Sequence, residues 1–159
     1  MALAVESTKQ AARDHDSSGV RVEKRMSNSI LIVDDDRFAA EALRIRLRTS
    51  HYRAVIATNG REAIQRFETL RPKVVILDAS MPDVSGFEVC QQIRALDPDR
   101  QTKIVFVSGA SSPSAEYVER CATFADGDAF LRKPCDICEL LSVIASSSIG
   151  SGRRSECTA

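Results

Sequence analysis

The stretch of sequence that decides the fold is Val74-Val75-Ile76-Leu77-Asp78-Ala79-Ser80-Met81-Pro82. Four apolar residues lead without interruption into a single carboxylate, and Pro72 and Pro82 bound the run. An apolar run of this length predicts a strand that is buried on both faces. Asp78 is then expected at the carboxyl end of a central strand, where open α/β sheets place their ligands. A charge in that position is costly unless a cation or hydrogen-bond donors compensate it.

Strands and helices are predicted to alternate along the chain on both sides of this stretch. Strands are predicted at 30–33, 53–57, 74–77, 104–107 and 129–131, and helices begin near residues 37, 60, 86, 113 and 136. In the first helix, Phe38, Ala42 and Ile45, and on an adjoining face Leu43 and Leu47, follow the helical period. Phe and Leu side chains on the helices are expected in the core. The alternation predicts an α/β fold, a doubly wound parallel sheet with helices on both faces.

Composition and charge exclude several classes of protein. The 159 residues include 22 basic and 22 acidic side chains, which argues against a broad surface for nucleic acid or anionic membranes. No apolar run approaches the ~18 residues of a membrane span, and the N-terminus has no signal-peptide core, so a cytoplasmic protein is expected. Five cysteines at irregular spacing do not form a disulfide framework.

The two ends of the chain differ from its middle. Residues 1–28 are polar and lack sustained periodicity, so they are predicted to be a disordered leader, and Met26 is an alternative start of translation. Residues 147–159 are predicted to be a disordered tail. The ordered domain is then expected at 29–146, and roughly 120 residues are enough for one complete core.

The polar residues that stand out all follow predicted strands. They are Asp34 and Asp35, Asp78, Ser108 and Lys133. Parallel strands end at one edge, so these residues are expected in one crevice. Two unit charges 4 Å apart repel by about 4 kcal/mol at an effective dielectric of 20, which Mg²⁺ would relieve by taking carboxylates, a carbonyl and waters as ligands. With a Lys and a hydroxyl to bind oxyanions, the set indicates phosphoryl transfer onto Asp78.

Five segments make a family resemblance specific. The sequence resembles the receiver domains of response regulators in two-component signalling, which are CheY-like. The matching segments occur in the family's order and at near-family spacing over about residues 29–146. They are 30–36 with its three aspartates, 59–63, 75–78 with Met81, Pro82 and Gly86, 107–110, and 131–134.

The resemblance implies a role for each site residue. Asp78 would be the phosphoacceptor, and Asp34, Asp35, Asp78 and the backbone carbonyl of Ser80 would hold Mg²⁺. Lys133 would pair with the phosphoryl oxygens, and the Ser108 hydroxyl would bind the phosphate. Phe130 corresponds to the switch aromatic and, having no phenolic oxygen, would act by packing alone. The implied fold is flavodoxin-like, with five parallel strands in the order 2-1-3-4-5.

The resemblance also implies the partners of the protein and the rate of its self-dephosphorylation. The phosphoryl donor would be a sensor histidine kinase or a His phosphotransfer protein. Because only a short polar tail follows residue 146, a stand-alone receiver is expected, which is not an enzyme and has at most slow self-dephosphorylation. It would act on a protein partner through the face of the fourth helix, fifth strand and fifth helix. Ser80 and Ala110 occupy the positions that tune dephosphorylation in the family, and since neither orients water well, slow self-dephosphorylation is expected.

Two other functions remain open from the residues. A haloacid-dehalogenase-type phosphatase would use Asp34 as its nucleophile, but Arg37 stands where Thr or Val is expected and Asp78 would have no role. A degenerate receiver would only bind partners, which the complete set of Asp, Ser and Lys residues disfavours.

Several notable residues have structural explanations. Asp36 is expected to cap the first helix, and Pro82 and Gly86 are expected to shape the loop below the site. The Cys135-x-x-Cys138 pair lacks the second ligand pair of a metal site and fits a helix start beside the core. His15 and His51 have no supporting cluster and are expected at the surface.

Overall fold

The structure is a computed structural model, in which residues 29–109, 123 and 125–146 are described. Its strands are β1 (Ser29–Val33), β2 (Arg53–Ala57), β3 (Val74–Asp78), β4 (Lys103–Ser108) and β5 (Ala129–Arg132). Its helices are α1 (Arg37–Thr49), α2 (Gly60–Leu70), α3 (Gly86–Leu96) and α5 (Ile137–Ala145). The predicted leader and tail, and all but residue 123 of the helix predicted near 113–124, lie outside the described residues.

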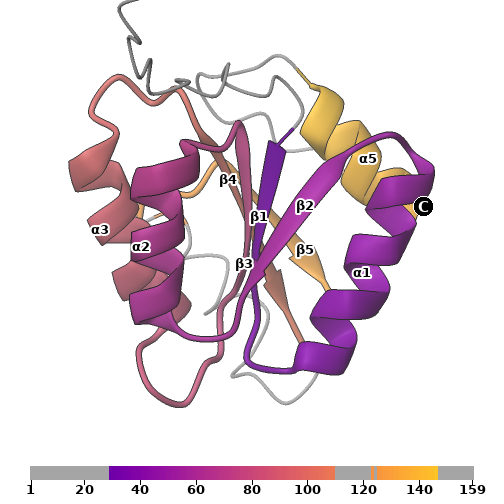
Figure 1. The fold of residues 1–159 in the computed structure, drawn as a ribbon, viewed down its shortest axis with the longest axis horizontal. Helices are drawn as coiled ribbons and strands as arrows, with labels where there is room; N and C mark the ends of the chain where they lie inside the picture. Colours follow the sequence, from indigo (N-terminus) through magenta and orange to yellow (C-terminus); the bar gives the residue numbers. More distant parts are fainter. Residues whose placement is uncertain (1–28, 110–122, 124, 147–159) are drawn as a thin grey trace, which may run out of the picture.

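The five strands form one parallel sheet in the order β2-β1-β3-β4-β5, which confirms the predicted topology. Figure 1 shows α2 and α3 on one face of the sheet and α1 and α5 on the other. Because all strands run the same way, their carboxyl ends share one edge. The connections from a helix to the next strand, such as residues 97–102, lie at the opposite edge. Among the described residues, no helix is long and apolar enough to cross a membrane.

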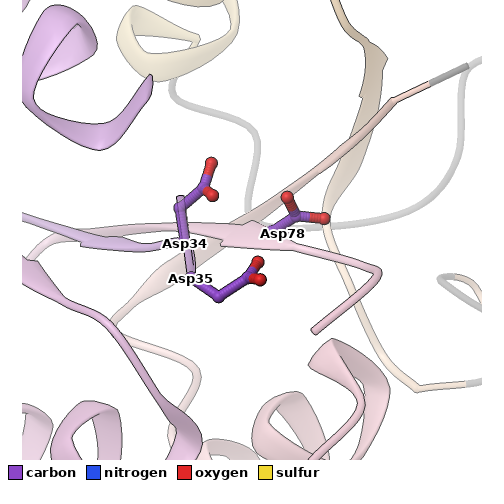
Figure 2. Close-up of side chains that lie close together, drawn as sticks. All are labelled: Asp34, Asp35 and Asp78. Carbon is purple, nitrogen blue, oxygen red and sulfur yellow. The ribbon is translucent and has the colours of Figure 1, made fainter. Parts of the chain in front are cut away.

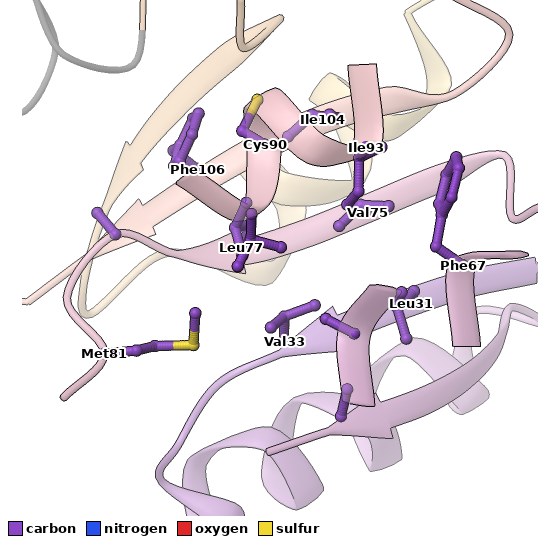
Figure 3. Close-up of a cluster of buried hydrophobic side chains, with 14 of the residues drawn as sticks. Leu31, Val33, Phe67, Val75, Leu77, Met81, Cys90, Ile93, Ile104 and Phe106 are labelled. Carbon is purple, nitrogen blue, oxygen red and sulfur yellow. The ribbon is translucent and has the colours of Figure 1, made fainter. Parts of the chain in front are cut away.

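The central strand β3 has a core on each of its faces, as its unbroken apolar sequence predicted. Val75 and Leu77 belong to the cluster beneath α2 and α3, which includes Phe67, Ile93 and Phe106 and is drawn in Figure 3. Val74 and Ile76 point to the other cluster, beneath α1 and α5. The two cores hold the sheet rigid, so the residues at the end of β3 have a fixed position.

Each described helix begins at a polar cap. Asp36 Oδ1 accepts hydrogen bonds from the backbone N–H groups of Phe38 and Ala39, at 2.9 and 3.2 Å, which confirms its predicted capping role. Asn59, Ser85 and Asp136 cap α2, α3 and α5 in the same way. The described helices therefore begin at residues 37, 60 and 86, as predicted, and at residue 137, one residue after the predicted start near 136.

The first helix packs differently from the prediction. Ala40 and Leu47 of α1 are buried, and Leu43 packs against the same core, but Phe38 is 90% exposed and Ile45 is 59% exposed. The expectation that helical Phe side chains belong to the core is therefore wrong for Phe38. The reason is geometric, because α1 covers the sheet with one narrow stripe and Phe38 and Ile45 lie on its other side.

Candidate functional site

Three carboxylates converge at the carboxyl edge of the sheet. Asp34 and Asp35 directly follow β1, and Asp78 is the last residue of β3 (Figure 2). One carboxylate oxygen from each lies within 4.8 Å of the others. Asp34 and Asp78 are buried, whereas Asp35 is exposed. Their proximity follows from the topology, since β1 and β3 are hydrogen-bonded neighbours although 44 residues separate Asp34 from Asp78 in the chain.

Lys133 bridges two of these carboxylates. Its Nζ lies 2.6 Å from Asp34 Oδ2 and 2.6 Å from Asp78 Oδ2. Lys133 follows β5, and its backbone N–H donates to the carbonyl of Ser108, which fixes the start of the loop against the end of β4. The lysine side chain is 30% exposed, so an incoming anion can reach the ammonium group.

Backbone donors hold the two buried carboxylates in place. Asp34 Oδ1 accepts from the N–H of Asp36 at 2.9 Å, and Asp78 Oδ1 accepts from the N–H of Ser80 at 2.8 Å. Each side chain therefore has one oxygen on the backbone and one on Lys133. Such charge-assisted bonds are strong and directional, so the positions of the Asp34 and Asp78 carboxylates are preorganised.

Burial and neighbouring charges in the site shift the pKa values of Asp34 and Lys133. Burial raises the pKa of Asp34, and the Asp78 carboxylate adds to this rise, while the bonds from Lys133 offset it in part. Burial alone would lower the pKa of Lys133, but its hydrogen bonds to Asp34 and Asp78 outweigh burial and raise it. Lys133 is therefore a cation at neutral pH, although one ammonium does not balance three carboxylates.

The carboxylate cluster has the chemistry of a site for a divalent cation. Hard cations such as Mg²⁺ take oxygen ligands, and Asp34, Asp35 and Asp78 offer one oxygen each within the separation given above. Lys133 neutralises only one of the three carboxylates, and the remaining negative charge favours a divalent cation. The residues present therefore fit Mg²⁺, with the exposed Asp35 on the solvent side.

Ser108 lies on β4, which pairs with β3, and Phe130 lies on β5, which pairs with β4. Ser108 is the buried last residue of β4, whose neighbour β3 ends in Asp78. Phe130 is on β5 opposite Phe106 and packs, partly buried, against the core beneath α3. The structure thus brings Ser108 to the same edge as Asp78, and it places Phe130 one strand farther out. Ala110 lies outside the described residues.

Gly86 has a closer relation to the site than the sequence indicated. From the sequence it was expected only to shape the loop below the site. A Cβ at this position would lie 2.1 Å from the backbone carbonyl oxygen of Asp78 and 3.0 Å from Ala79 Cα. The start of α3 therefore packs directly against the backbone of Asp78, and only glycine permits this approach. The contact spans a loop of seven residues, so no periodic signal in the sequence reports it.

The two cysteines near the site, Cys135 and Cys138, are not joined in a disulfide. Cys135 is half-buried and Cys138 is exposed, and burial raises the pKa of Cys135. The only group of three or more metal-ligating side chains found among the described residues is the aspartate cluster. His51 is exposed, as expected, and His15 lies outside the described residues.

A family comparison and a comparison with curated proteins both lead to response regulators. Residues 30–145 match the family described as the response regulator receiver domain. Response regulator MprA of Mycolicibacterium vanbaalenii is 40% identical over 114 residues, which cover 71% of this chain and 47% of that protein. MprA of Mycobacterium ulcerans is 38% identical over 118 residues, or 74% of this chain and 48% of that protein. The chain thus spans about half the length of the curated relatives it matches.

Solved structures share the fold. A CheY-like response regulator receiver domain protein from Methanospirillum hungatei superposes with a TM-score of 0.67 at 28% identity, over 75% of this chain and 91% of that one. A receiver domain from Bermanella marisrubri gives a TM-score of 0.63 at 34% identity, over 75% of this chain and 96% of that one.

Proposed function

This chain belongs to the response regulator receiver domain family, and from that premise we propose that Asp78 accepts a phosphoryl group from a phosphohistidine. The donor is a sensor histidine kinase or a His phosphotransfer protein. The observation that carries the proposal is the bridge from Lys133 Nζ to both Asp34 and Asp78, beside a third carboxylate. That arrangement brings a nucleophile, a cation site and a lysine that can bind an oxyanion together at one edge of the sheet.

The proposed step is a transfer between a nitrogen and an oxygen. A carboxylate oxygen of Asp78 attacks phosphorus, a P–O bond forms, and the N–P bond breaks with its electron pair returning to the imidazole. Asp34, Asp35, Asp78 and the backbone carbonyl of Ser80 would hold Mg²⁺, which would supply positive charge to offset that of the phosphoryl oxygens. Lys133 exchanges its contact with Asp78 Oδ2 for a phosphoryl oxygen while keeping Asp34.

The product changes the charge that faces Ser108. Phosphorylation adds roughly −1.5 to −2 charge, and the Ser108 hydroxyl then donates to a phosphoryl oxygen. Since Ser108 and Phe130 lie on paired strands, movement of Ser108 biases the packing of Phe130. The output surface is the face of β5, α5 and the helix expected at 113–124, which binds a downstream protein rather than nucleic acid. The setting for this relay is the cytoplasm.

The experiment treats the full chain with acetyl phosphate and Mg²⁺ and measures the intact mass. Wild type gains one phosphoryl group, which Asp78→Asn abolishes and peptide mapping assigns to Asp78. Asp99→Asn, an exposed carboxylate on the opposite edge, is the matched control and is labelled like wild type. Label on Asp34 would instead indicate the phosphatase chemistry. That phosphatase family uses an Asp-x-Asp motif, which here would be Asp34 and Asp36. Against that chemistry, the carboxylate of Asp36 is occupied as a helix cap.

The phosphorylated form is expected to persist. Ser80 is exposed beside the acceptor and orients an attacking water poorly, and Ala110 has no polar group to do so. After removal of acetyl phosphate by desalting, the acyl phosphate should outlast the first minutes by intact mass. Loss within seconds contradicts this prediction.

A further inference from the structure

A cavity lies beneath helix α1. Helices α1 and α5 cover the same face of the sheet (Figure 1), and a space of about 250 Å³ remains between α1, the sheet and the segment that follows β5. Lys133 lines this space at the carboxyl edge of the sheet, and Arg46 lines it farther along α1. Most of the other lining residues are apolar, including Ile32, Val33, Ala39, Leu43, Ile137 and Leu140. Such a lining favours an apolar occupant over water.

The two cations of the lining differ in what they contact. The ammonium group of Lys133 lies 2.6 Å from both Asp34 and Asp78, so its charge is already engaged. Arg46 is exposed, and its guanidinium forms no hydrogen bond or ion pair with a described residue. Its neighbour Glu41 pairs with Arg44 at 2.5 Å and does not neutralise it. The cavity therefore offers an anion one uncommitted positive charge, at Arg46.

The volume and depth of the cavity restrict what it can hold. Pockets for drug-sized ligands have volumes of about 300–1,000 Å³, whereas a cavity of about 150 Å³ holds benzene. By the latter ratio, a space of about 250 Å³ accommodates an apolar molecule of about ten non-hydrogen atoms. The lining includes Ile32, Ile76 and Val107 of the sheet itself, all of them buried. The space thus reaches beneath α1, which suits a small free molecule.

The cavity is open to solvent. Ala42 on α1 and Pro134 after β5 both line it and are both exposed, so an entrance lies between these two segments. Arg46 lies one turn of helix after Ala42 and is exposed as well. A ligand can therefore place its apolar part in the cavity while its charged group stays near water, in contact with Arg46.

We propose that this cavity binds a small monocarboxylate with an apolar body, such as a free medium-chain fatty acid. The carboxylate accepts hydrogen bonds from the guanidinium of Arg46, whose planar fork matches a carboxylate in geometry. The chain is buried against Leu43, Ile137 and Leu140, and each methylene removed from water adds to the affinity. The inference goes beyond the proposed function, because this binding requires neither a phosphohistidine donor nor phosphorylation of Asp78.

The test titrates octanoate, octanol, octylammonium and butyrate into the isotope-labelled full chain and follows amide chemical shifts. Octanoate should bind saturably, with shifts in α1 and residues 133–140. Octanol should bind at least threefold more weakly because it lacks the charge. Octylammonium, which Arg46 repels, and butyrate, which buries less apolar surface, should each bind at least tenfold more weakly. Shifts that do not saturate, shifts confined to another part of the chain, or equal affinity for octanoate and any of the other compounds would overturn the proposal.

Variants connect the binding to the named residues. Arg46→Gln should weaken octanoate to the level of octanol and leave the affinity for octanol unchanged. Arg61→Gln, an exposed arginine on α2, is the matched control and should change neither affinity. Ala39→Leu fills part of the cavity and should weaken octanoate and octanol alike, at least tenfold. Unchanged binding of octanoate by Arg46→Gln would overturn the assignment of the carboxylate to that residue.

A thiol provides a second readout in the wild-type chain. Cys135 is half-buried and lines the cavity, whereas Cys138 is exposed and is not part of the lining. Saturating octanoate should slow the alkylation of Cys135 by iodoacetamide at least fivefold and leave the rate at Cys138 unchanged, as peptide mapping measures. An unchanged rate at Cys135 would overturn the proposal even if Ala39→Leu failed to fold. Labelling by acetyl phosphate without octanoate is a separate measurement, and its failure would count against the proposed function alone.

Discussion

At the scale of single residues, the site depends on groups that are held from two sides. Asp78 is fixed by the N–H of Ser80 and by Lys133, and its backbone carbonyl is in contact with Gly86. The carboxylates and the lysine were predicted from the sequence, because a charged residue after an apolar strand is conspicuous. The tight approach of Gly86 was not, because a glycine in a loop looks the same whether it is crowded or free.

Gly86→Ala is therefore expected to displace Asp78, the proposed phosphoacceptor. The added methyl would lie 2.1 Å from the Asp78 carbonyl oxygen, so the backbone must move, at a cost of about 1–3 kcal/mol in the free energy of unfolding. The rate of labelling by acetyl phosphate should fall with it. Gly109→Ala is the matched control, because its Cβ would meet no atom within 4 Å, and both urea unfolding and labelling measure the difference. Equal stability of the two variants would contradict the steric argument.

At the scale of elements, side chains join strands to helices in ways that periodicity does not reveal. Lys103 begins β4, yet its Nζ donates to the carbonyl of Val143 and the hydroxyl of Ser146 at the end of α5, at 2.7 and 2.9 Å. A cation there complements the helix dipole. In the sequence this lysine only precedes an apolar run, so the predicted strand began one residue later.

The start of α2 gives a prediction about pH. Glu62 accepts hydrogen bonds from the N–H of Thr58 at 2.8 Å and from Arg66, and these bonds lower the pKa of its carboxyl group below 4.5. A lowered pKa in the folded state means that the stabilisation is fully present above pH 4.5 and is lost as the pH falls through the folded value.

Glu62→Gln should thus lower the free energy of unfolding by about 1 kcal/mol at pH 7, and the difference from wild type should vanish in acid. Urea unfolding at several pH values measures it. Glu68→Gln, an exposed residue of the same helix, should match wild type throughout. A difference for Glu62→Gln that does not change with pH would show that the charge is irrelevant.

At the scale of the whole molecule, most of what could be predicted from the sequence follows from the topology of the sheet. Five alternating units imply a parallel sheet, and its shared edge brings Asp34, Asp78 and Lys133 together from three distant segments. The burial of α1 was less predictable. Phe38 and Leu47 belong to two different apolar faces of the helix, and only the tertiary arrangement decides that Leu47 faces the sheet and Phe38 faces solvent.

Cation binding at the shared edge should stabilise the entire domain. At a Mg²⁺ concentration 100-fold above Kd, binding to the folded state adds about 2.7 kcal/mol, which raises the Tm by several degrees. Asp35→Asn should remove most of this increase while leaving the Tm without Mg²⁺ almost unchanged, because Asp35 is exposed. Asp99→Asn should keep the increase. Thermal unfolding with and without Mg²⁺ measures it, and an undiminished increase in Asp35→Asn would contradict the proposed ligand set.

The separation between the two edges of the sheet also makes the domain suitable for fragment complementation. A break between Pro98 and Arg100, which are exposed at the edge away from the site, yields one piece with the three aspartates and another with Ser108 and Lys133. Neither piece contains a whole reaction centre. Acyl-phosphate formation would therefore report reassembly of the halves, and fusing each half to a different protein would turn the domain into a chemical sensor of their encounter.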